Sequence, residues 1–491
     1  MELDPRTPVV VGVGQLVQRA DDPADAVEPL AMMTDVVVRA AEDAGAPGLA
    51  KSADAVWVVQ GAWPYHDPGA LIGERLGASL RHTALSPNGG NSPQSLLNKA
   101  ATSIAAGERD VVVLCGAEAI HSRRAARAAG VTIPTTHDDD TPKAPLLGAE
   151  VPMSSDLERS RGFEMPINIY PLFESAIRHA RGETIEGHLE RVSQLWAGFN
   201  RVAVANPYAW SRTPMTAAEI ATPSRSNRMV GFPYTKAMNS NWYLDQAAAV
   251  IVCSAGAAAA AGVPRERWVF PWAGTDAHDT PLFSERLDLH SSPAIRTAGA
   301  KAFELAGIGV DDVAHVDLYS CFPSAVQIAA AELGLGLDRQ LTQTGGLTFA
   351  GGPLNNYVMH GIASLVATLR EHPGEVGLQT ANGGYVTKHA IGLYSTEPPT
   401  RPFAHEDCQD AVDALGSRET APDHDGEATL EAYTVMHDHD GPRTALVTAL
   451  TADGRRALAS SGDAGFMASL MATESVGTTI HVSADGTANP T

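Results

Sequence analysis

The turn between Ser86 and Pro93 (SPNGGNSP), with the helix that follows it, has the residue types best suited to chemistry. Ser92 can cap the helix by accepting a backbone amide hydrogen bond, and Pro93 suits the first helical position because it has no amide to leave unpaired. The free N–H groups and partial positive charge at such a helix start stabilise a thiolate or a bound anion. The sequence therefore predicts an anion site here, and the question is which residue, if any, acts as a nucleophile.

The cysteines are isolated in the sequence. The four of them lie far apart and without C-x-x-C spacing, at Cys115, Cys253, Cys321 and Cys408. This pattern favours neither a disulfide framework nor a structural zinc site, and no metal site is predicted. Cys115 and Cys253 lie within apolar runs and are interpreted as structural. The Gly12-Val13-Gly14 turn lacks the third glycine of a dinucleotide-binding fingerprint, so we expect no nucleotide site.

Composition narrows the class of protein. With 491 residues, of which 44% are apolar, the chain can bury several cores. Its formal net charge of −22 argues against nucleic acid or an anionic membrane as the main partner. No apolar run reaches the roughly 18 residues of a membrane helix, and the first residues do not resemble a signal peptide. We expect a cytoplasmic protein that is not inserted in a membrane.

The elements that position the Ser86–Pro93 turn occur in two similar sets. The first set has a strand at 9–13, a helix at 29–44, a strand at 55–60, the buried helix after Ser92 and a strand at 110–115. The second has a helix at 294–306, a strand at 313–318, a helix at 361–370 and a strand at 375–380, followed by Gly383 and Gly384. Alternating strands and helices repeated in this way predict a duplicated α/β fold with sheets buried on both faces.

Changes in composition predict the domain boundaries. Residues 1–118 with 239–265 form the first half, and 266–398 the second. Residues 119–238, rich in Arg, His, Pro, Asn, Trp and Tyr, are expected to be an inserted loop domain. The run EPPTRP opens a linker at 399–425. Short strand-like segments separated by Asp-Gly turns predict a small C-terminal β-barrel or sandwich at 426–491.

Five motifs in order resemble the thiolase superfamily. They are the 86–118 stretch, DQAAAVIVCS at 245–254, DLYSCF at 317–322, GGPLNNYVMHG at 351–361 and NGG at 382–384. The chain is most similar to the thiolase-like and sterol-carrier-type branch, some members of which carry an extra C-terminal β domain. The resemblance implies that residues 426–491 form such a domain, a small OB-like β-barrel. The resemblance implies a five-layered fold of two β-α-β-α-β halves, whose central helices start at one pocket where carbon–carbon bonds of acyl-CoA are made or cleaved.

The resemblance also implies catalytic positions. Gly90 matches the nucleophilic cysteine of thiolases, so the thiol is absent. Gly90 and the following Asn91 and Ser92 are expected to bind the coenzyme A substrate. Cys321 matches the acid–base cysteine of the sterol-carrier-type branch, and Tyr319 stands where that branch has histidine. His360 falls beside the histidine of the Gly-His-Pro motif and is expected to act as base or oxyanion donor, or else to pack at the helix start.

Further residues are candidates for substrate binding. Tyr357 and the neighbouring Asn355 and Asn356 either face the pocket or lie in solvent, and Gly383 and Gly384 are expected at its rim. The basic cluster Arg178, His179 and Arg181 either meets coenzyme A phosphates or forms a solvated helix face. No cofactor is expected beyond coenzyme A as the carrier of the substrate.

Three functions remain open. The first is an acetyl-CoA C-acyltransferase of lipid metabolism, although thiolase turnover without a nucleophilic cysteine is not expected. The second is a retro-aldol lyase for a β-hydroxyacyl-CoA, with Tyr319 and Tyr357 as the residues to examine. The third is a non-catalytic protein that binds coenzyme A or a lipid. Thiolases pair through the strand before the nucleophile, and Pro87 weakens such pairing, so a monomer or weak homodimer is predicted.

Overall fold

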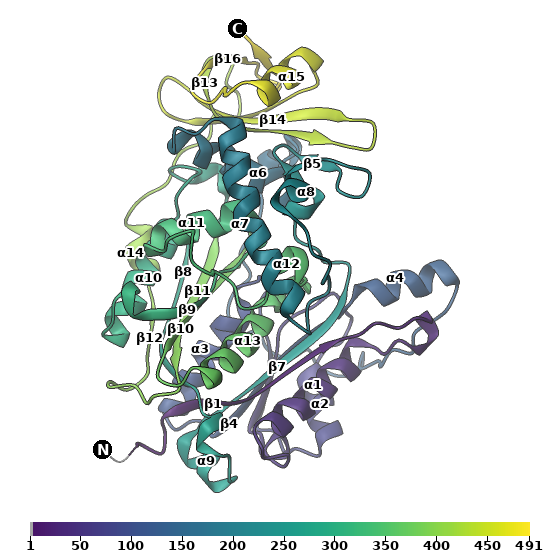
Figure 1. Cartoon of the computed structure of the whole chain (residues 1–491), viewed down its shortest axis with the longest axis vertical. Coiled ribbons are helices and arrows are strands. Elements are labelled where there is room, and N and C mark those ends of the chain that lie inside the picture. The colour runs from purple at the N-terminus through teal and green to yellow at the C-terminus, as the bar shows by residue number, and fades with distance from the viewer. Residues whose placement is uncertain (1–2) are drawn as a thin grey trace.

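The computed structural model describes residues 3–491 and contains three β-sheets (Figure 1). The first sheet has the order β1-β7-β4-β2-β3. Its strands are β1 (Pro8–Val17), β7 (Asp245–Ser254), β4 (Val111–Ala119), β2 (Ala55–Val58) and β3 (His82–Leu85). β7 runs antiparallel to both β1 and β4, whereas β2 is parallel to β4 and β3. β7 therefore returns the chain to the first sheet after the long insertion.

The second sheet repeats this arrangement. Its order is β12-β8-β11-β10-β9, formed by β12 (Ala404–Asp407), β8 (Phe270–His278), β11 (Lys388–Ser395), β10 (Val376–Gly383) and β9 (Val313–Asp317). β11 is antiparallel to β8 and β10, as β7 is to β1 and β4, and β9 is parallel to β10. The predicted duplicated α/β fold is confirmed.

Two helices lie between the sheets. α3 (Ser92–Ala105) and α13 (Tyr357–Glu371) pack against each other and against strands of both sheets. α1 (Pro29–Asp43) and α2 (Pro68–Leu76) cover the outer face of the first sheet, and α10 (Pro293–Ala306), beside α11 (Pro323–Leu333), covers that of the second. Successive residues of β4 alternate between the two faces: Val112 and Leu114 pack with α3, Val111 and Val113 with α1. The core thus has five layers.

The insertion between β4 and β7 is mostly helical. It contains α4 (Ile120–Ala129), α5 (Asp156–Ser160), α6 (Pro166–Ala180), α7 (Ile185–Ala205) and α8 (Ala217–Ala221), with the short strands β5 (Met229–Gly231) and β6 (Tyr234–Thr235). Within residues 3–491, no helix combines the length and the apolar character needed to cross a membrane.

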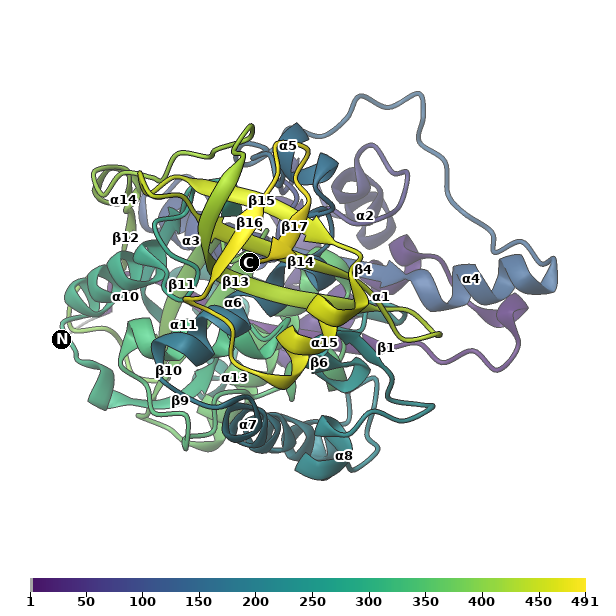
Figure 2. The ribbon, with the colours of Figure 1, turned by 90° about the horizontal axis from the view of Figure 1, so that it is seen from above.

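The C-terminal residues form a third sheet above the insertion (Figure 2). Its main order is β15-β14-β13-β16-β17, with β13 (Gly426–His437), β14 (Pro442–Leu450), β15 (Arg456–Ser461), β16 (Thr479–Val482) and β17 (Ala488–Pro490). A parallel bridge between Ser460 and Thr487 links the two ends of this order, and α15 (Ala464–Ala472) lies between β15 and β16. This connectivity is that of the OB fold, a partly open five-stranded barrel.

The barrel is joined to the rest of the chain on two sides. β13 pairs with β5 of the insertion, and Phe232 N donates to Val435 O at 2.9 Å. The segment predicted to be a linker, 399–425, also packs against the rest of the chain. Its strand β12 pairs in parallel with β8 and covers an otherwise open sheet edge, and Ala421 N donates to Arg456 O at 2.8 Å. The barrel therefore sits in a fixed place over α6.

Candidate functional site

The two halves of the core meet at Gly90, just before α3. A Cβ atom at Gly90 would lie 2.5 Å from Asn382 O of β10, and closer still to the hydroxyl oxygen of Tyr319, which follows β9. Real Cβ atoms do not approach other atoms so closely. Residues of the second half therefore fill the space into which a side chain at position 90 would extend.

The start of α3 differs from the predicted cap. Ser92 Oγ donates to Pro87 O at 2.8 Å and does not cap the helix. The N-cap residue is Asn91, whose backbone is already helical and whose side chain makes no capping bond. The prediction was wrong because the 87–90 turn curls back over the helix start, so the carbonyl of Pro87 takes the Ser92 hydroxyl. Among the described residues, no donor pairs with the buried Asn91 Oδ1.

Gly383 and Lys388 bring the end of the second sheet against this turn. A Cβ at Gly383 would lie 2.6 Å from Asn91 Oδ1 and 3.0 Å from Gly89 Cα, so only glycine permits this approach. The Lys388 ammonium donates to Asn88 O, and its burial lowers its pKa. Sequence reasoning missed Lys388, although its place four residues after the NGG motif was a usable signal. Gly384 has a positive φ of 69° and turns the chain away from Gly383.

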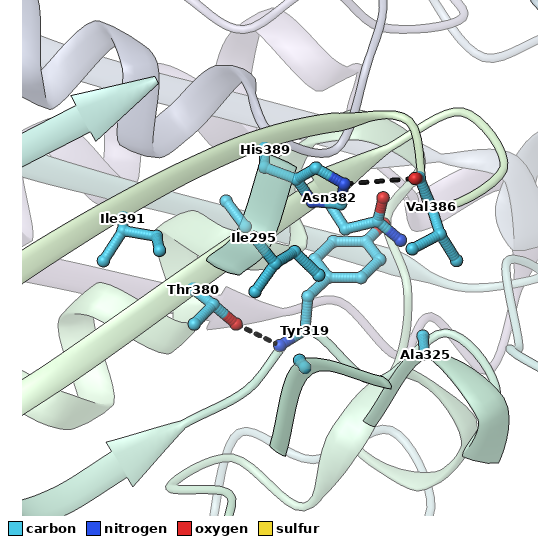
Figure 3. Close-up of a pocket in the computed structure, with 10 residues that line it drawn as sticks. Ile295, Tyr319, Ala325, Thr380, Asn382, Val386, His389 and Ile391 are labelled. Carbon is cyan, nitrogen blue, oxygen red and sulfur yellow. Dashed lines mark hydrogen bonds between the residues drawn. The ribbon is translucent and has the colours of Figure 1, made fainter. Parts of the chain in front are cut away.

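Tyr319 borders a very small cavity that is also lined by residues of α10, α11, β10 and β11 (Figure 3). The cavity measures about 10 Å³, room for about one water molecule. Thr380 Oγ1 accepts a hydrogen bond from Tyr319 N at 2.9 Å, and the Tyr319 ring packs edge-on against Tyr357, with centroids 5.5 Å apart. Burial raises the pKa of the Tyr319 phenol well above its usual value. The phenol is therefore neutral near pH 7 and keeps its O–H hydrogen.

Cys321 is close to this cavity but is not poised as a nucleophile. Its side chain is 7% exposed, and Asn382 Nδ2 lies 3.9 Å from its sulfur. Burial raises the pKa of the Cys321 thiol to about 12, so the thiolate needed for attack is scarce at neutral pH.

Tyr170, on α6 of the insertion, completes the site and was not predicted. Its hydroxyl donates to Gly384 O at 2.9 Å and accepts from Asn382 Nδ2 at 3.1 Å. Its ring stacks on Phe322 with centroids 4.3 Å apart. A single aromatic residue in an inserted helix carries no sequence signal of its own, which is why it was missed.

His360 lies near the start of α13 and faces the first sheet. Its Nδ1 pairs with Gln15 Oε1 of β1 at 2.8 Å, and none of its described hydrogen bonds reaches Gly90, Tyr319 or Cys321. Burial lowers the pKa of His360 to about 3, so the ring is neutral near pH 7. The structure therefore shows no hydrogen bond between His360 and the other predicted catalytic residues, and among the described residues no partner pairs with its buried Nε2.

The loop before His360 is buried. Asn355 Oδ1 accepts from Gly89 N at 3.0 Å, and Asn356 Nδ2 donates to Gly116 O at 2.8 Å. Tyr357 is fully buried, and its hydroxyl pairs with Thr344 Oγ1 at 2.7 Å. Of the two readings left open for this loop, exposure to solvent is excluded. The asparagines hold the Ser86–Pro93 turn and the end of β4, while Tyr357 is engaged in the core.

The basic cluster on α6 serves the C-terminal barrel. Arg178 is 1% exposed, donates to Tyr433 Oη at 2.8 Å and forms an ion pair with Glu474. Arg181 pairs with Glu183 at 2.8 Å. Neither interpretation of Arg178, as a contact for coenzyme A phosphates or as part of a solvated helix face, is right, because residues of the barrel already surround its guanidinium.

A much larger groove runs between α7, the 337–343 segment and α13. Its volume is about 1180 Å³. Arg191, Arg201 and Arg339 line it, against the acidic Asp338 and Glu371. Phe199 of α7 lines the groove, and its ring packs beside Gly346, where a Cβ would lie 2.8 Å from that ring and 3.0 Å from Ser320 Oγ. The groove and the small cavity at Tyr319 share no lining residue.

Comparisons with known proteins agree with this architecture. A family model described as the additional C-terminal domain of thiolase-like protein type 1 matches residues 407–487. Among solved structures, a monomeric SCP2-thiolase like protein type 1 from Mycobacterium smegmatis is 32% identical, with all of both chains covered and a TM-score of 0.85. No curated protein sequence is significantly similar.

More distant structures share the fold. The Ltp2-ChsH2(DUF35) aldolase has a TM-score of 0.61 at 18% identity, covering 80% of this chain and 99% of that one. The dimeric peroxisomal thiolase of Saccharomyces cerevisiae has a TM-score of 0.55 at 13% identity, covering 81% and 99%. The duplicated core, the OB-like barrel and the full-length match together show that this chain belongs to the SCP2-thiolase-like protein type 1 family of the thiolase superfamily.

Proposed function

We propose that the chain binds a coenzyme A thioester and does not transfer its acyl group through a cysteine. The observation that carries the proposal is the position of the Tyr319 hydroxyl beside Gly90, in the space of the missing side chain. An acyl transferase of the thiolase type needs a thiolate there, because the acyl group must be held covalently between the two half-reactions. Cys321 does not replace it, since its thiol is protonated near pH 7.

The groove between α7 and α13 is the proposed place for the ligand. The cavity at Tyr319 holds no more than a water molecule, whereas the groove is large enough for a pantetheine arm and nucleotide. Arg201 is exposed on α7 and presents a positive charge for phosphate groups, and Arg339 lies on the facing segment. The chain as a whole has a net charge of −22, so the arginines that line this groove form a locally positive region. Such a region supports an anionic ligand.

A retro-aldol lyase acting on a β-hydroxyacyl-CoA is the second candidate. It requires no covalent acyl carrier, only a base and donors for the thioester enolate. The neutral phenol of Tyr319 at the start of α3 supports it, because a phenol there can donate to an enolate oxygen. Tyr357 gives no such support, since its hydroxyl is taken by Thr344 and Ser320.

Equilibrium binding tests the proposal and its location. Titration of the full chain with acetyl-CoA should give saturable binding that Arg201→Ala weakens roughly tenfold, as expected for one phosphate contact. Arg225→Ala removes an equally exposed charge from the insertion outside the groove and should leave affinity unchanged. Equal affinity of wild type and Arg201→Ala for acetyl-CoA would exclude the groove as the binding site. No binding at millimolar acetyl-CoA would contradict the proposal as a whole. Release of a ketone or aldehyde from a β-hydroxyacyl-CoA would favour the lyase.

We also propose that the protein is a monomer. Residues 145–147 of the same chain cover the outer edge of β3: Leu85 N donates to Pro145 O, and Leu147 N to Leu85 O, each at 2.9 Å. A covered edge offers no backbone groups to a second copy. The M. smegmatis relative is described as monomeric, which agrees. Sedimentation at micromolar concentration should give a single species near 51 kDa; a dimer would contradict this.

A further inference from the structure

We propose that His315, His372 and Glu375 form a binding site for a divalent transition-metal ion, Zn²⁺ in particular. Each residue offers one ligand atom, and the three atoms lie within 4.8 Å of one another. His315 Nε2 is 2.5 Å from Glu375 Oε2, and the two imidazole rings are 5.0 Å apart. The site does not rest on the proposed function, although Glu371, next to His372, also lines the groove.

Backbone structure fixes all three ligands. His372 and Glu375 are the ends of a His-Pro-Gly-Glu turn, closed by a hydrogen bond from Glu375 N to His372 O at 3.3 Å. Pro373 with the positive φ of 89° at Gly374 is typical of a type II turn, and Gly374 N is anchored on Thr396 Oγ1 at 2.8 Å. Pairing of β9 with β10 sets His315 opposite Gly377, beside this turn. A rigid scaffold of this kind lowers the entropy cost of gathering ligands.

The ligand set suits zinc. Two imidazoles and one carboxylate, with a water molecule in the fourth position, make a tetrahedral Zn²⁺ site with bonds of about 2.0–2.2 Å, which places the ligand atoms about 3.3 Å apart. Small side-chain rotations reach that spacing, because the His315 and Glu375 side chains are 17% and 48% exposed and free to adjust. Zn²⁺ at this position would take the place of the proton between His315 and Glu375.

The charges around these three residues favour a bound cation. His372 is the C-cap of α13, where the helix end carries a partial negative charge. Glu371 adds a further carboxylate next to it, while Arg370 is directed away, to Asp43 and the carbonyls of Val11 and Arg267. No basic side chain therefore competes, among these neighbours, for the position of the ion.

Sequence reasoning did not find this site because His315 is far from the other two residues along the chain. A second His and acid cluster, Asp438, His439 and Asp440, lies within a single exposed hairpin and lacks a ligand from another element. It therefore serves as the matched control for unspecific surface binding.

Zinc titration of the metal-free full chain tests the proposal. Calorimetry should show one Zn²⁺ per chain at this site, and His315→Ala, His372→Ala and Glu375→Gln should each weaken binding at least roughly tenfold. His439→Ala should leave this affinity unchanged. Co²⁺ in place of Zn²⁺ should give the intense visible absorption of a four-coordinate ion in wild type and not in His372→Ala.

A stability measurement guards against misfolded variants. All variants should melt as wild type does without metal, since the residues are partly exposed, and saturating Zn²⁺ should raise the Tm of wild type and His439→Ala only. Zn²⁺ binding that is equal in wild type and His372→Ala, loss of binding in His439→Ala alone, or no Zn²⁺ binding by wild type would each overturn the proposal.

Discussion

The Tyr319 hydroxyl, from the second half of the core, lies beside the backbone of Gly90 in the first half and fills the space of a side chain at that position. Gly90 precedes the central helix α3, whereas Tyr319 follows β9 and precedes α11 on the outer face of the second sheet, so this contact joins the two halves of the core. It explains why the start of α3 keeps its glycine, and it leaves the site with a phenol where a thiol would need to be.

Gly90→Ala should destabilise the protein by about 1–3 kcal/mol, because the added methyl group overlaps the Tyr319 hydroxyl and Asn382 O. Tyr319→Phe in the Gly90→Ala background should recover part of this loss, since it removes one of the two obstacles. Urea denaturation of the four proteins of this cycle measures the coupling. Gly48→Ala is the control, because a Cβ there meets no atom within 4 Å. If the effects of Gly90→Ala and Tyr319→Phe on the free energy of unfolding were additive, the two residues would not be in contact.

His360 should make the fold sensitive to acid. Its pKa is about 3 in the folded chain, below the usual 6.5, so the unfolded chain binds a proton more readily between these values. The contribution of neutral His360 to the free energy of unfolding is complete above pH 6.5. As the pH falls from 6.5 to 5, this contribution decreases by about 2 kcal/mol. His360→Gln should flatten that slope in urea midpoints measured at several pH values. An unchanged slope would show that the ring is not buried neutral.

Cys321 should resist alkylation in the native protein. Burial raises its pKa to about 12, so the thiolate is a minor species at pH 7.5. Iodoacetamide treatment followed by peptide mapping should leave Cys321 unmodified in native protein and modify it fully after denaturation. Denatured protein is the internal control. Rapid labelling of native Cys321 near neutral pH would contradict this prediction and make Cys321 a candidate nucleophile.

Arg178 should hold the C-terminal barrel in place. Arg178→Ala leaves Glu474 and the Tyr433 hydroxyl without their partner, a loss of about 3 kcal/mol for a buried ion pair. The segment 399–425 should then become sensitive to trypsin in limited proteolysis. Arg181→Ala, which removes a more exposed neighbour, should digest as wild type does. Equal resistance of all three proteins would mean that the barrel is held by other contacts.

Prediction from sequence succeeded where burial alone decides structure. The run DQAAAVIVCS became β7 with both ends as expected, because all ten residues are buried. β8 and β11 were not predicted, since their runs contain charged and glycine residues that are buried only through the opposing sheet and helices. In the site, Gly90, Tyr319 and Gly383 come together as the resemblance implies. Ser92 was misjudged because the carbonyl of Pro87, only five residues earlier, accepts its hydroxyl hydrogen. Tyr170 was missed because its partners Asn382 and Gly384 lie 212 and 214 residues later in the chain.

Intact mass spectrometry tests the central claim most directly. The full chain is incubated with excess acetyl-CoA at pH 7.5, and its mass is measured alongside the binding titration. Saturable binding with an unchanged protein mass is the result we predict, since no thiolate stands at Gly90 and the Cys321 thiol is protonated. A mass increase equal to one acetyl group, mapped to Cys321, would show acyl transfer through a cysteine and contradict the account.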